Sequence, residues 1–180
     1  MAGEFAGRTV LVTGGSRGIG LGIAEGFAAA GAEVVVCGRT QSGSLPFEMV
    51  VCDVREPGEV EALVAGVVSR TGRLDVVVNN AGGSPDALVA QASPRLAERV
   101  VALNLLAPLY VARAANAVMQ QQSDGGVIVN IGSVAARRPA PGTAAYAAAK
   151  AGLTVLTRAL ALEWAPRVRV VQVTPGLVRT

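Results

Sequence analysis

The chain of 180 residues contains no histidine and few aromatic side chains. Histidine is the usual acid or base near neutral pH and the commonest metal ligand, so proton chemistry must fall to other side chains. A zinc site would have to be built from two cysteines and carboxylates, and we expect no metal. Aromatic residues make up 3% of a chain that is 51% hydrophobic, so valine, leucine, isoleucine and alanine must build its core.

The charges and the cysteines limit which binding partners and which cellular compartment we expect. The net charge is +3, but the arginines are scattered and form no basic stripe with aromatics between them, so we expect no nucleic-acid partner. No uninterrupted apolar run is long enough to span a bilayer, and the N-terminus lacks the order of a signal peptide, so we expect no membrane association. The two cysteines form no CxxC pair and fit a reducing cytoplasm.

Lysine occurs once, at Lys150, four residues after Tyr146. Residues i and i+4 share one face of a helix, so the ammonium is expected beside the phenol. A neighbouring positive charge favours phenolate and is expected to lower the tyrosine pKa from about 10 toward the range useful for acid–base catalysis. The alternative is an ordinary helix with a half-buried tyrosine and a solvated lysine.

Apolar runs alternate with helical patterns along the chain. Nearly continuous Val/Ile runs are typical of strands buried on both faces, as in a parallel sheet. The sequence therefore predicts one doubly wound α/β domain over residues 1–180, with helices on both faces of a parallel sheet. The predicted strands are Thr9–Thr13, Glu33–Cys37, Glu48–Cys52, Asp75–Asn79, Val127–Ile131 and Val168–Val173. The predicted helices are Gly18–Ala30, Gly58–Thr71, Ser93–Asn104, Pro108–Gln122 and Ala144–Trp164.

Two places depart from a regular alternation. Pro108 is expected to kink or divide the helical segment that it interrupts. Only residues 39–47 join the second and third strands, and this Ser/Gly-rich link is shorter than a crossover with a helix needs. We expect a loop there.

The first strand–helix junction, Thr13–Gly20, is rich in glycine. Such a turn lets the backbone approach a ligand, and the following helix N-terminus offers unpaired N–H groups to a pyrophosphate. Residues Gly14–Gly18 also match the G-x-S-x-G turn of serine hydrolases, but this chain lacks the histidine that would activate Ser16. A purely structural glycine turn is the remaining alternative.

These features resemble the short-chain dehydrogenase/reductase family in their order and spacing. The resemblance rests on Thr13, Gly14, Gly18 and Gly20, on Asp53-Val54, on Asn79-Asn80-Ala81-Gly82, and on Asn104, Ser133, Tyr146, Lys150, Pro175, Gly176 and Thr180. It implies a Rossmann-like fold and hydride transfer between a nicotinamide cofactor and a carbonyl or alcohol substrate.

The resemblance also implies catalytic roles. Tyr146 would be the acid/base, and Lys150 would lower its pKa and hold the nicotinamide ribose. Ser133 would donate a hydrogen bond to the substrate oxygen, and Asn104 would hold a water that relays protons from Lys150. The alternatives are a turn serine at Ser133 and a helix-kink amide at Asn104.

Asp53 would face the adenine amino group with Val54 against the ring, although Asp53 could instead cap the helix after Pro57. Residues 79–82 would close against the adenine ribose, and Pro175 and Gly176 would form the wall beside the nicotinamide, with Thr180 near its carboxamide. The full set of expected cofactor contacts is Gly14, Ser16, Arg17, Gly18, Ile19, Gly20, Arg39, Asp53, Val54, Asn80, Ala81, Gly82, Tyr146, Lys150, Pro175, Gly176 and Thr180.

Cofactor choice is predicted from the end of the second strand. Enzymes selecting NAD usually carry a carboxylate there for the ribose 2′-hydroxyl, but this chain has Gly38 followed by Arg39. Arg39, with Arg17 from the glycine turn, could hold a 2′-phosphate, so NADP(H) is expected over NAD(H). The alternative is that both arginines are solvated loop residues.

The resemblance further implies a homo-oligomer, a tetramer or a dimer, that packs through the helix 144–164. The chain ends at Thr180, where family members continue, so we expect their substrate-covering segment to be absent from this sequence. A non-catalytic dinucleotide-binding regulator or scaffold of the same fold stays open as the alternative function.

Overall fold

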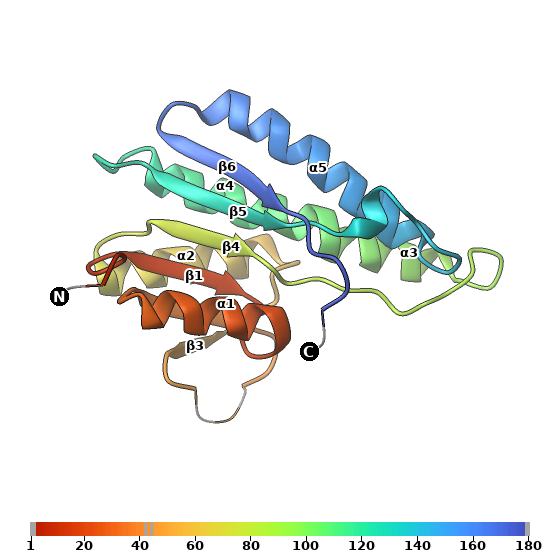
Figure 1. The fold of residues 1–180 in the computed structure, drawn as a ribbon, viewed down its shortest axis with the longest axis horizontal. Coiled ribbons are helices and arrows are strands. Elements are labelled where there is room, and N and C mark those ends of the chain that lie inside the picture. Colours follow the sequence, from red (N-terminus) through yellow and green to blue (C-terminus); the bar gives the residue numbers. More distant parts are fainter. Residues whose placement is uncertain (1–2, 42, 44, 179–180) are drawn as a thin grey trace.

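The computed structural model describes residues 3–41, 43 and 45–178, which form one α/β domain (Figure 1). The strands are β1 (Thr9–Thr13), β2 (Glu33–Gly38), β3 (Glu48–Val51), β4 (Val76–Asn79), β5 (Gly126–Ile131) and β6 (Val168–Val173). The α-helices are α1 (Gly18–Ala29), α2 (Pro57–Thr71), α3 (Pro94–Val101), α4 (Ala107–Met119) and α5 (Ala144–Trp164), with a π-helical turn η1 (Ala102–Leu106) and a 3-10 turn η2 (Val134–Ala136). The predicted elements are therefore confirmed, with ends that differ by a few residues.

The sheet has the strand order β3-β2-β1-β4-β5-β6, and all of its neighbouring strands are parallel. Because the strands are parallel, their carboxyl ends lie at one edge of the sheet, and the order in which the strands are added switches sides between β1 and β4, the position where open α/β sheets bind ligands. The central strands are buried along their whole length, which explains their unbroken valine runs.

Helices cover the two faces unequally (Figure 1). On one face, α2, α4 and α5 pack over the larger core cluster, which includes Leu11, Val77 and Ile128. On the other face, α1 packs over β1 and β2. On β6 the side chains alternate, so that Val171 and Val173 are exposed on the face opposite α5.

The link between β2 and β3 contains no helix in its described part. Residues 39–41, 43 and 45–47 form neither helix nor strand, as expected from the shortness of the link. The edge of the sheet at β3 therefore lies beside an open loop.

The expectation that Pro108 kinks or divides its segment is confirmed in part, since a π-helical turn separates α3 from α4 but the backbone stays helical. Residues 94–119 form one continuous helix, because the π-helical turn η1 joins α3 to α4 just before the proline. The turn widens the backbone where proline cannot donate a hydrogen bond. By length and composition alone this helix could cross a membrane, a test that the core helices of soluble proteins also pass, and here α4 packs against β4 and β5.

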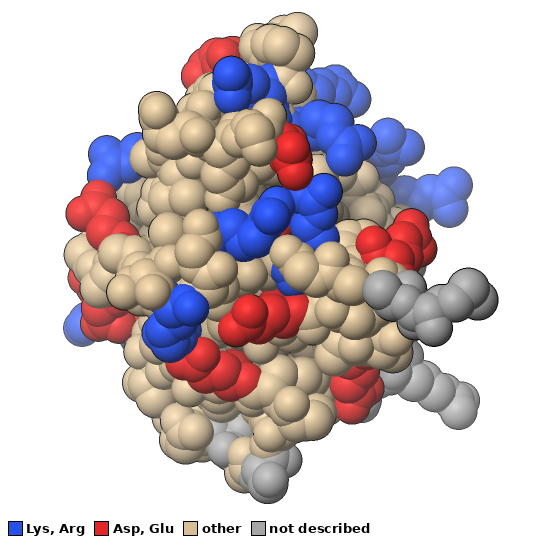
Figure 2. All heavy atoms as spheres, turned by 90° about the vertical axis from the view of Figure 1, so that its left-hand side faces the viewer, with Lys and Arg blue, Asp and Glu red and all other residues tan. Residues whose placement is uncertain are grey.

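An ion-pair cluster joins the amino ends of three strands. The buried Asp75 carboxylate accepts hydrogen bonds from Arg8 (2.7 Å), from Arg73 (2.5 and 2.7 Å) and from the Thr9 backbone N–H (2.9 Å). Asp124 pairs with Arg8 at 2.9 Å. Figure 2 shows this end of the molecule, where basic and acidic side chains lie next to one another.

Candidate active site

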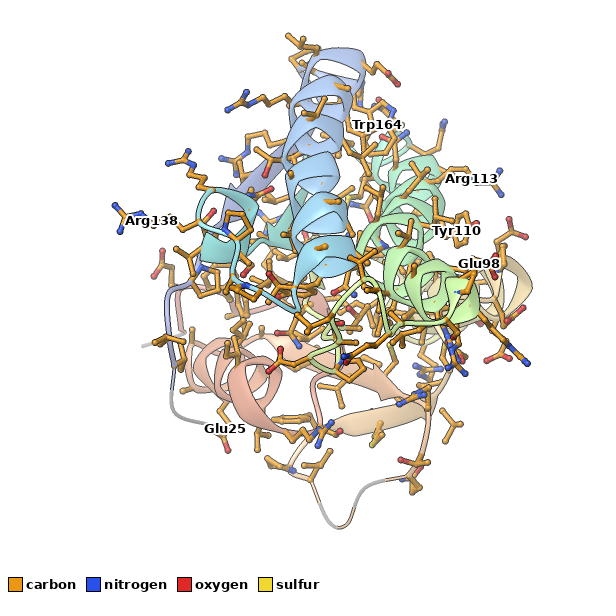
Figure 3. The ribbon with its side chains drawn as sticks, turned by 90° about the vertical axis from the view of Figure 1, so that its right-hand side faces the viewer. Glu25, Glu98, Tyr110, Arg113, Arg138 and Trp164 are labelled. Carbon is orange, nitrogen blue, oxygen red and sulfur yellow. The ribbon has the colours of Figure 1, made fainter. Side chains whose placement is uncertain are left out.

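A cleft of about 1200 Å³ lies at the carboxyl ends of the strands. Figure 3 views the molecule from this end, with α5 above α1. The cleft is lined by Ser133 and by all of the expected cofactor contacts except Thr180, which lies outside the described residues. Side chains predicted from separate stretches of the sequence are therefore brought together in one cavity.

Tyr146 and Lys150 lie one turn apart near the start of α5. The Lys150 Nζ atom is 5.9 Å from the centre of the Tyr146 ring. Lys150 is 3% exposed and donates a hydrogen bond of 2.7 Å to the backbone carbonyl of Ile131 at the end of β5. Burial lowers the pKa of Lys150 to about 8. The alternative of a solvated lysine is therefore wrong.

Ser133 begins the 3-10 turn that follows β5. Its Oγ accepts a hydrogen bond of 3.1 Å from the backbone N–H of Ala135, which fixes the hydroxyl at the wall of the cleft. An oxygen that accepts through one lone pair keeps its hydrogen available for a ligand. The geometry thus suits donation to a substrate oxygen.

Asn104 lies in the π-helical turn and is fully buried. Its Oδ1 accepts from the Gly83 N–H (2.9 Å), and its Nδ2 donates to the carbonyls of Gly83 (2.8 Å) and Val100 (2.9 Å). A side chain added at Gly82 would come within 2.9 Å of Asn104 Oδ1 and 3.4 Å of Lys150 Nζ, so these groups converge. Asn104 does not line the cleft, and backbone carbonyls accept from its amide group. Its water relay stays a prediction.

The glycine turn forms as predicted between β1 and α1. Gly14 has a φ of 63°, a left-handed conformation that favours glycine. A side chain at Gly20 would lie 2.3 Å from the Gly14 carbonyl, so this glycine serves packing of the helix on the turn. The Asn80 amide donates to the carbonyls of Thr13 (2.9 Å) and Gly14 (3.1 Å) and holds the turn in place.

The first turn of α1 is available to an anion. Arg17 precedes the helix and gives it no side-chain cap, so the first N–H groups keep their capacity to bind a ligand. Arg17 also lines the cleft, together with Ser16, Gly18 and Ile19. This is the arrangement expected for binding a pyrophosphate.

The strand ends of β2 and β3 form the far end of the cleft. Arg39 follows β2, and Asp53 follows β3 with Val54, which is buried. Hydrogen bonds from Arg55 are the largest cause of the lowered pKa of Asp53, and the positive charges of Arg55 and Arg39 lower it further. Burial acts in the opposite direction but is outweighed. The carboxylate therefore stays ionised and can act as an acceptor.

Some lining residues were not predicted. Cys37 and Cys52 lie at the ends of the same two strands, are both free and both buried, and line the cleft. The Ile131 carbonyl that holds Lys150 was also missed, because a backbone group gives no signal in the sequence. Within the described residues no group of three or more Cys, Asp or Glu side chains could hold a metal ion.

A smaller apolar cavity of about 250 Å³ lies beside the cleft. Its lining includes Ser84 and Pro85, which follow the cleft residue Gly83, and Ala145, which precedes Tyr146. Val89 and Leu96 also line it, near the start of α3.

The same fold occurs in known proteins. The family profile of the short chain dehydrogenases matches residues 8–180. The chain is 38% identical to an L-fucose dehydrogenase of Oryctolagus cuniculus, over 98% of this chain and 65% of the relative. It is 37% identical to the 3-oxoacyl-[acyl-carrier-protein] reductase MabA of Mycobacterium bovis (strain ATCC BAA-935 / AF2122/97), over 98% of this chain and 71% of the relative.

A solved structure has the same fold. The crystal structure of a putative short-chain alcohol dehydrogenase from Sinorhizobium meliloti 1021 superposes with a TM-score of 0.92 at 36% identity, over 98% of this chain and 74% of that one. The chain thus spans about two thirds to three quarters of the length of these proteins. From its sequence, its parallel sheet and its cleft, the chain belongs to the short-chain dehydrogenase/reductase family of oxidoreductases.

Proposed function

We propose that this chain transfers hydride between NADP(H) and a carbonyl or secondary alcohol, with Tyr146 as the acid/base. The observation that carries the proposal is the placement of Tyr146, Lys150 and Ser133 at one wall of a cleft whose other parts suit a dinucleotide. A binding module has no need of this proton-transfer set.

The residues fit the cofactor along the length of the cleft. The uncapped first turn of α1 suits the pyrophosphate, and Asp53 and Arg39 suit the adenosine end. Arg39 and Arg17 both line the cleft, and either guanidinium can make charge-assisted hydrogen bonds to a 2′-phosphate. This supports NADP(H) over NAD(H).

A bound nicotinamide supplies or accepts the hydride. Tyr146 moves a proton to or from the substrate oxygen, and Ser133 donates a hydrogen bond to the same oxygen while negative charge develops on it. Lys150, fixed by the Ile131 carbonyl, places its ammonium beside the phenol and stabilises negative charge there. Asn104 fixes the backbone at Gly83, next to these groups.

We further propose a cytoplasmic homo-oligomer that packs through α5. Val155 and Leu162 on this helix are 65% and 84% exposed, and a second subunit would bury them. The two free cysteines suit a reducing compartment.

The test begins with NADPH fluorescence on mixing with the chain, followed by a screen of ketones, aldehydes and secondary alcohols. Binding with turnover of at least one compound is the expected result. Binding without turnover across the screen would favour the non-catalytic regulator. A chain that binds neither NADPH nor NADH would overturn the proposal.

A further inference from the structure

The smaller apolar cavity adjoins the proposed reaction site on two sides. On one side, its lining residue Ser84 follows Gly83 of the cleft. On the other side, its lining residue Ala145 precedes Tyr146 in the first turn of α5. Gly83 is itself held in place, because its N–H and its carbonyl are both bonded to Asn104. A substrate whose oxygen lies at Tyr146 therefore has this cavity beside it.

The frame of the cavity is built by backbone contacts. Its walls come from the β4–α3 loop, from α3 and from the turn before α5, and the loop and the turn lie side by side (Figure 1). The Ala87 N–H donates to the Gly142 carbonyl at 3.1 Å and joins the loop to the turn. Gly142 has a φ of 83°, a left-handed conformation that favours glycine. The cavity is thus formed before a ligand binds.

The lining gives a polar ligand few partners. Among the described residues that line the cavity, no side chain is charged or carries an amide, and the two polar ones, Ser84 and Ser93, are exposed. Ser84 donates to the carbonyl of Pro85 at 2.9 Å, and Ser93 caps α3 by accepting from the Leu96 N–H at 3.2 Å. A hydroxyl group placed deeper in the cavity would lose its bonds to water without replacement, which is unfavourable.

The size of the cavity suits a substituent larger than a methyl group. Its volume is about 250 Å³, and an apolar cavity of about 150 Å³ in another protein is enough to bind benzene. Alanines at positions 87, 92, 97 and 145 leave this space open. Each methylene group that a ligand buries there should tighten binding about fourfold.

We propose that this cavity holds one substituent of the reacting carbonyl carbon, so that the substrates are ketones or secondary alcohols with an apolar, unhydroxylated alkyl or aryl group on that side. This rests on the proposed function, because the reacting oxygen must lie at Tyr146. The cavity then selects among substrates, while the cleft binds the cofactor.

The experiment compares two ketones of nearly equal size, methyl propyl ketone and its analogue with a hydroxyl in place of the terminal methyl of the propyl group. Hydride passes from NADPH to the carbonyl carbon and a proton from Tyr146 to the oxygen, so the loss of NADPH absorbance measures both reductions. We expect kcat/KM to favour methyl propyl ketone by about tenfold or more. Methyl ethyl ketone, which is one methylene shorter, should have a kcat/KM about fourfold lower than the propyl ketone.

Ala97→Phe tests the cavity itself, because Ala97 lines it from α3 and does not line the cleft. The larger ring should fill the space and bring the preference between the two matched ketones to within about twofold of equality. The Kd of NADPH should not change. Ala62→Phe, at an exposed position of α2, is the matched control and should keep the preference of the parent.

Equal kcat/KM values for the two matched ketones in the parent overturn the proposal, and so does a preference that Ala97→Phe leaves unchanged. If Ala97→Phe fails to fold by its thermal transition, Val89→Asn decides, because Val89 lines the cavity but is 72% exposed. This variant should lower the preference at least about twofold, and an unchanged preference contradicts the proposal.

The proposed function fails in a different way. A parent that reduces other compounds of the screen but neither of the matched ketones contradicts the role of the cavity alone. A parent that does not bind NADPH, or that reduces none of the screened compounds, overturns the proposed function and this assignment with it.

Discussion

The ammonium of Lys150 donates a 2.7 Å hydrogen bond to the carbonyl of Ile131, which anchors α5 to the carboxyl end of β5. The same contact fixes the ammonium near the Tyr146 ring in a buried position. Burial lowers the pKa of Lys150 from 10.5 to about 8, so this arrangement places a destabilising charge where the proposed chemistry needs it.

This burial predicts how stability depends on pH. Since the folded-state pKa lies below the unfolded value, the folded chain binds fewer protons between pH 8 and 10.5, and stability rises with pH across that window. Lys150→Met removes this dependence. The difference in the free energy of unfolding, variant minus parent, should be largest below pH 8. It should fall by up to about 3 kcal/mol as the pH rises toward 10.5. Denaturant titrations at several pH values measure it, and a difference that does not change with pH would contradict it.

Lys150→Arg keeps a positive charge but replaces a compact donor with a planar fork. The fork differs in shape from the compact donor that the Ile131 carbonyl holds, so turnover should drop steeply, by about 10-fold or more. The pH profile of the residual activity should move to higher pH. An arginine variant with full activity would show that charge alone suffices and that the special role of lysine is wrong.

Arg39→Asp should move cofactor preference toward NAD(H), since a carboxylate repels the 2′-phosphate and can accept from a 2′-hydroxyl. The measurement is kcat/KM for NADPH and NADH with one substrate, with Arg113→Asp as the surface control. We expect the parent to favour NADPH. A parent that favours NADH, or a variant with an unchanged preference, would contradict the assignment of Arg39.

Asp75 is expected to carry much of the acid sensitivity of the fold. Burial alone would raise its pKa, but hydrogen bonds from Arg73, the Thr9 N–H and Arg8 outweigh burial and lower it. A lowered folded-state pKa gives stability that is present above the unfolded value and is lost as pH falls through the folded value. Asp75→Asn should cost about 2–3 kcal/mol at pH 7 and flatten the loss of stability below pH 4. Equal acid-induced loss in variant and parent would refute this.

The strands and most helices could be predicted because the sheet is buried on both faces. Valine runs such as Val34–Val36 and Val76–Val78 are typical of strands buried on both faces of a sheet. Their alternation with helical segments then restricts the possible strand orders. The glycine turn and the Tyr146–Lys150 spacing are likewise local signals. These features predict most of the residues that line the cleft.

The continuous helix through Pro108 could not be predicted, because its cause is tertiary. Asn104 bonds to Val100 within the helix and to Gly83 in the β4–α3 loop, and these contacts accompany the π-helical turn that accommodates the proline. Local propensity at Pro108 favours a break, and the packing of α4 on the sheet overrides it.

The contact between Arg55 and Asp53 could not be predicted from the sequence, for a different reason. The Arg55 guanidinium bonds the Asp53 carboxylate and does not itself line the cleft, and nothing in the spacing of the two residues predicts this contact. The lowered pKa of Lys150 was also missed, because the depth of burial follows from the packing of α5 against η1, η2 and β6.

The central claim is that Tyr146 moves the proton. Tyr146→Phe keeps the ring and its packing but removes the hydroxyl, so turnover on a substrate of the parent should fall by roughly 10²–10⁴-fold while the Kd of NADPH changes little. Measuring kcat and the NADPH Kd on the same preparation tests this directly. Lost turnover with retained cofactor binding is the predicted result, and a phenylalanine variant with near-normal turnover would contradict the account.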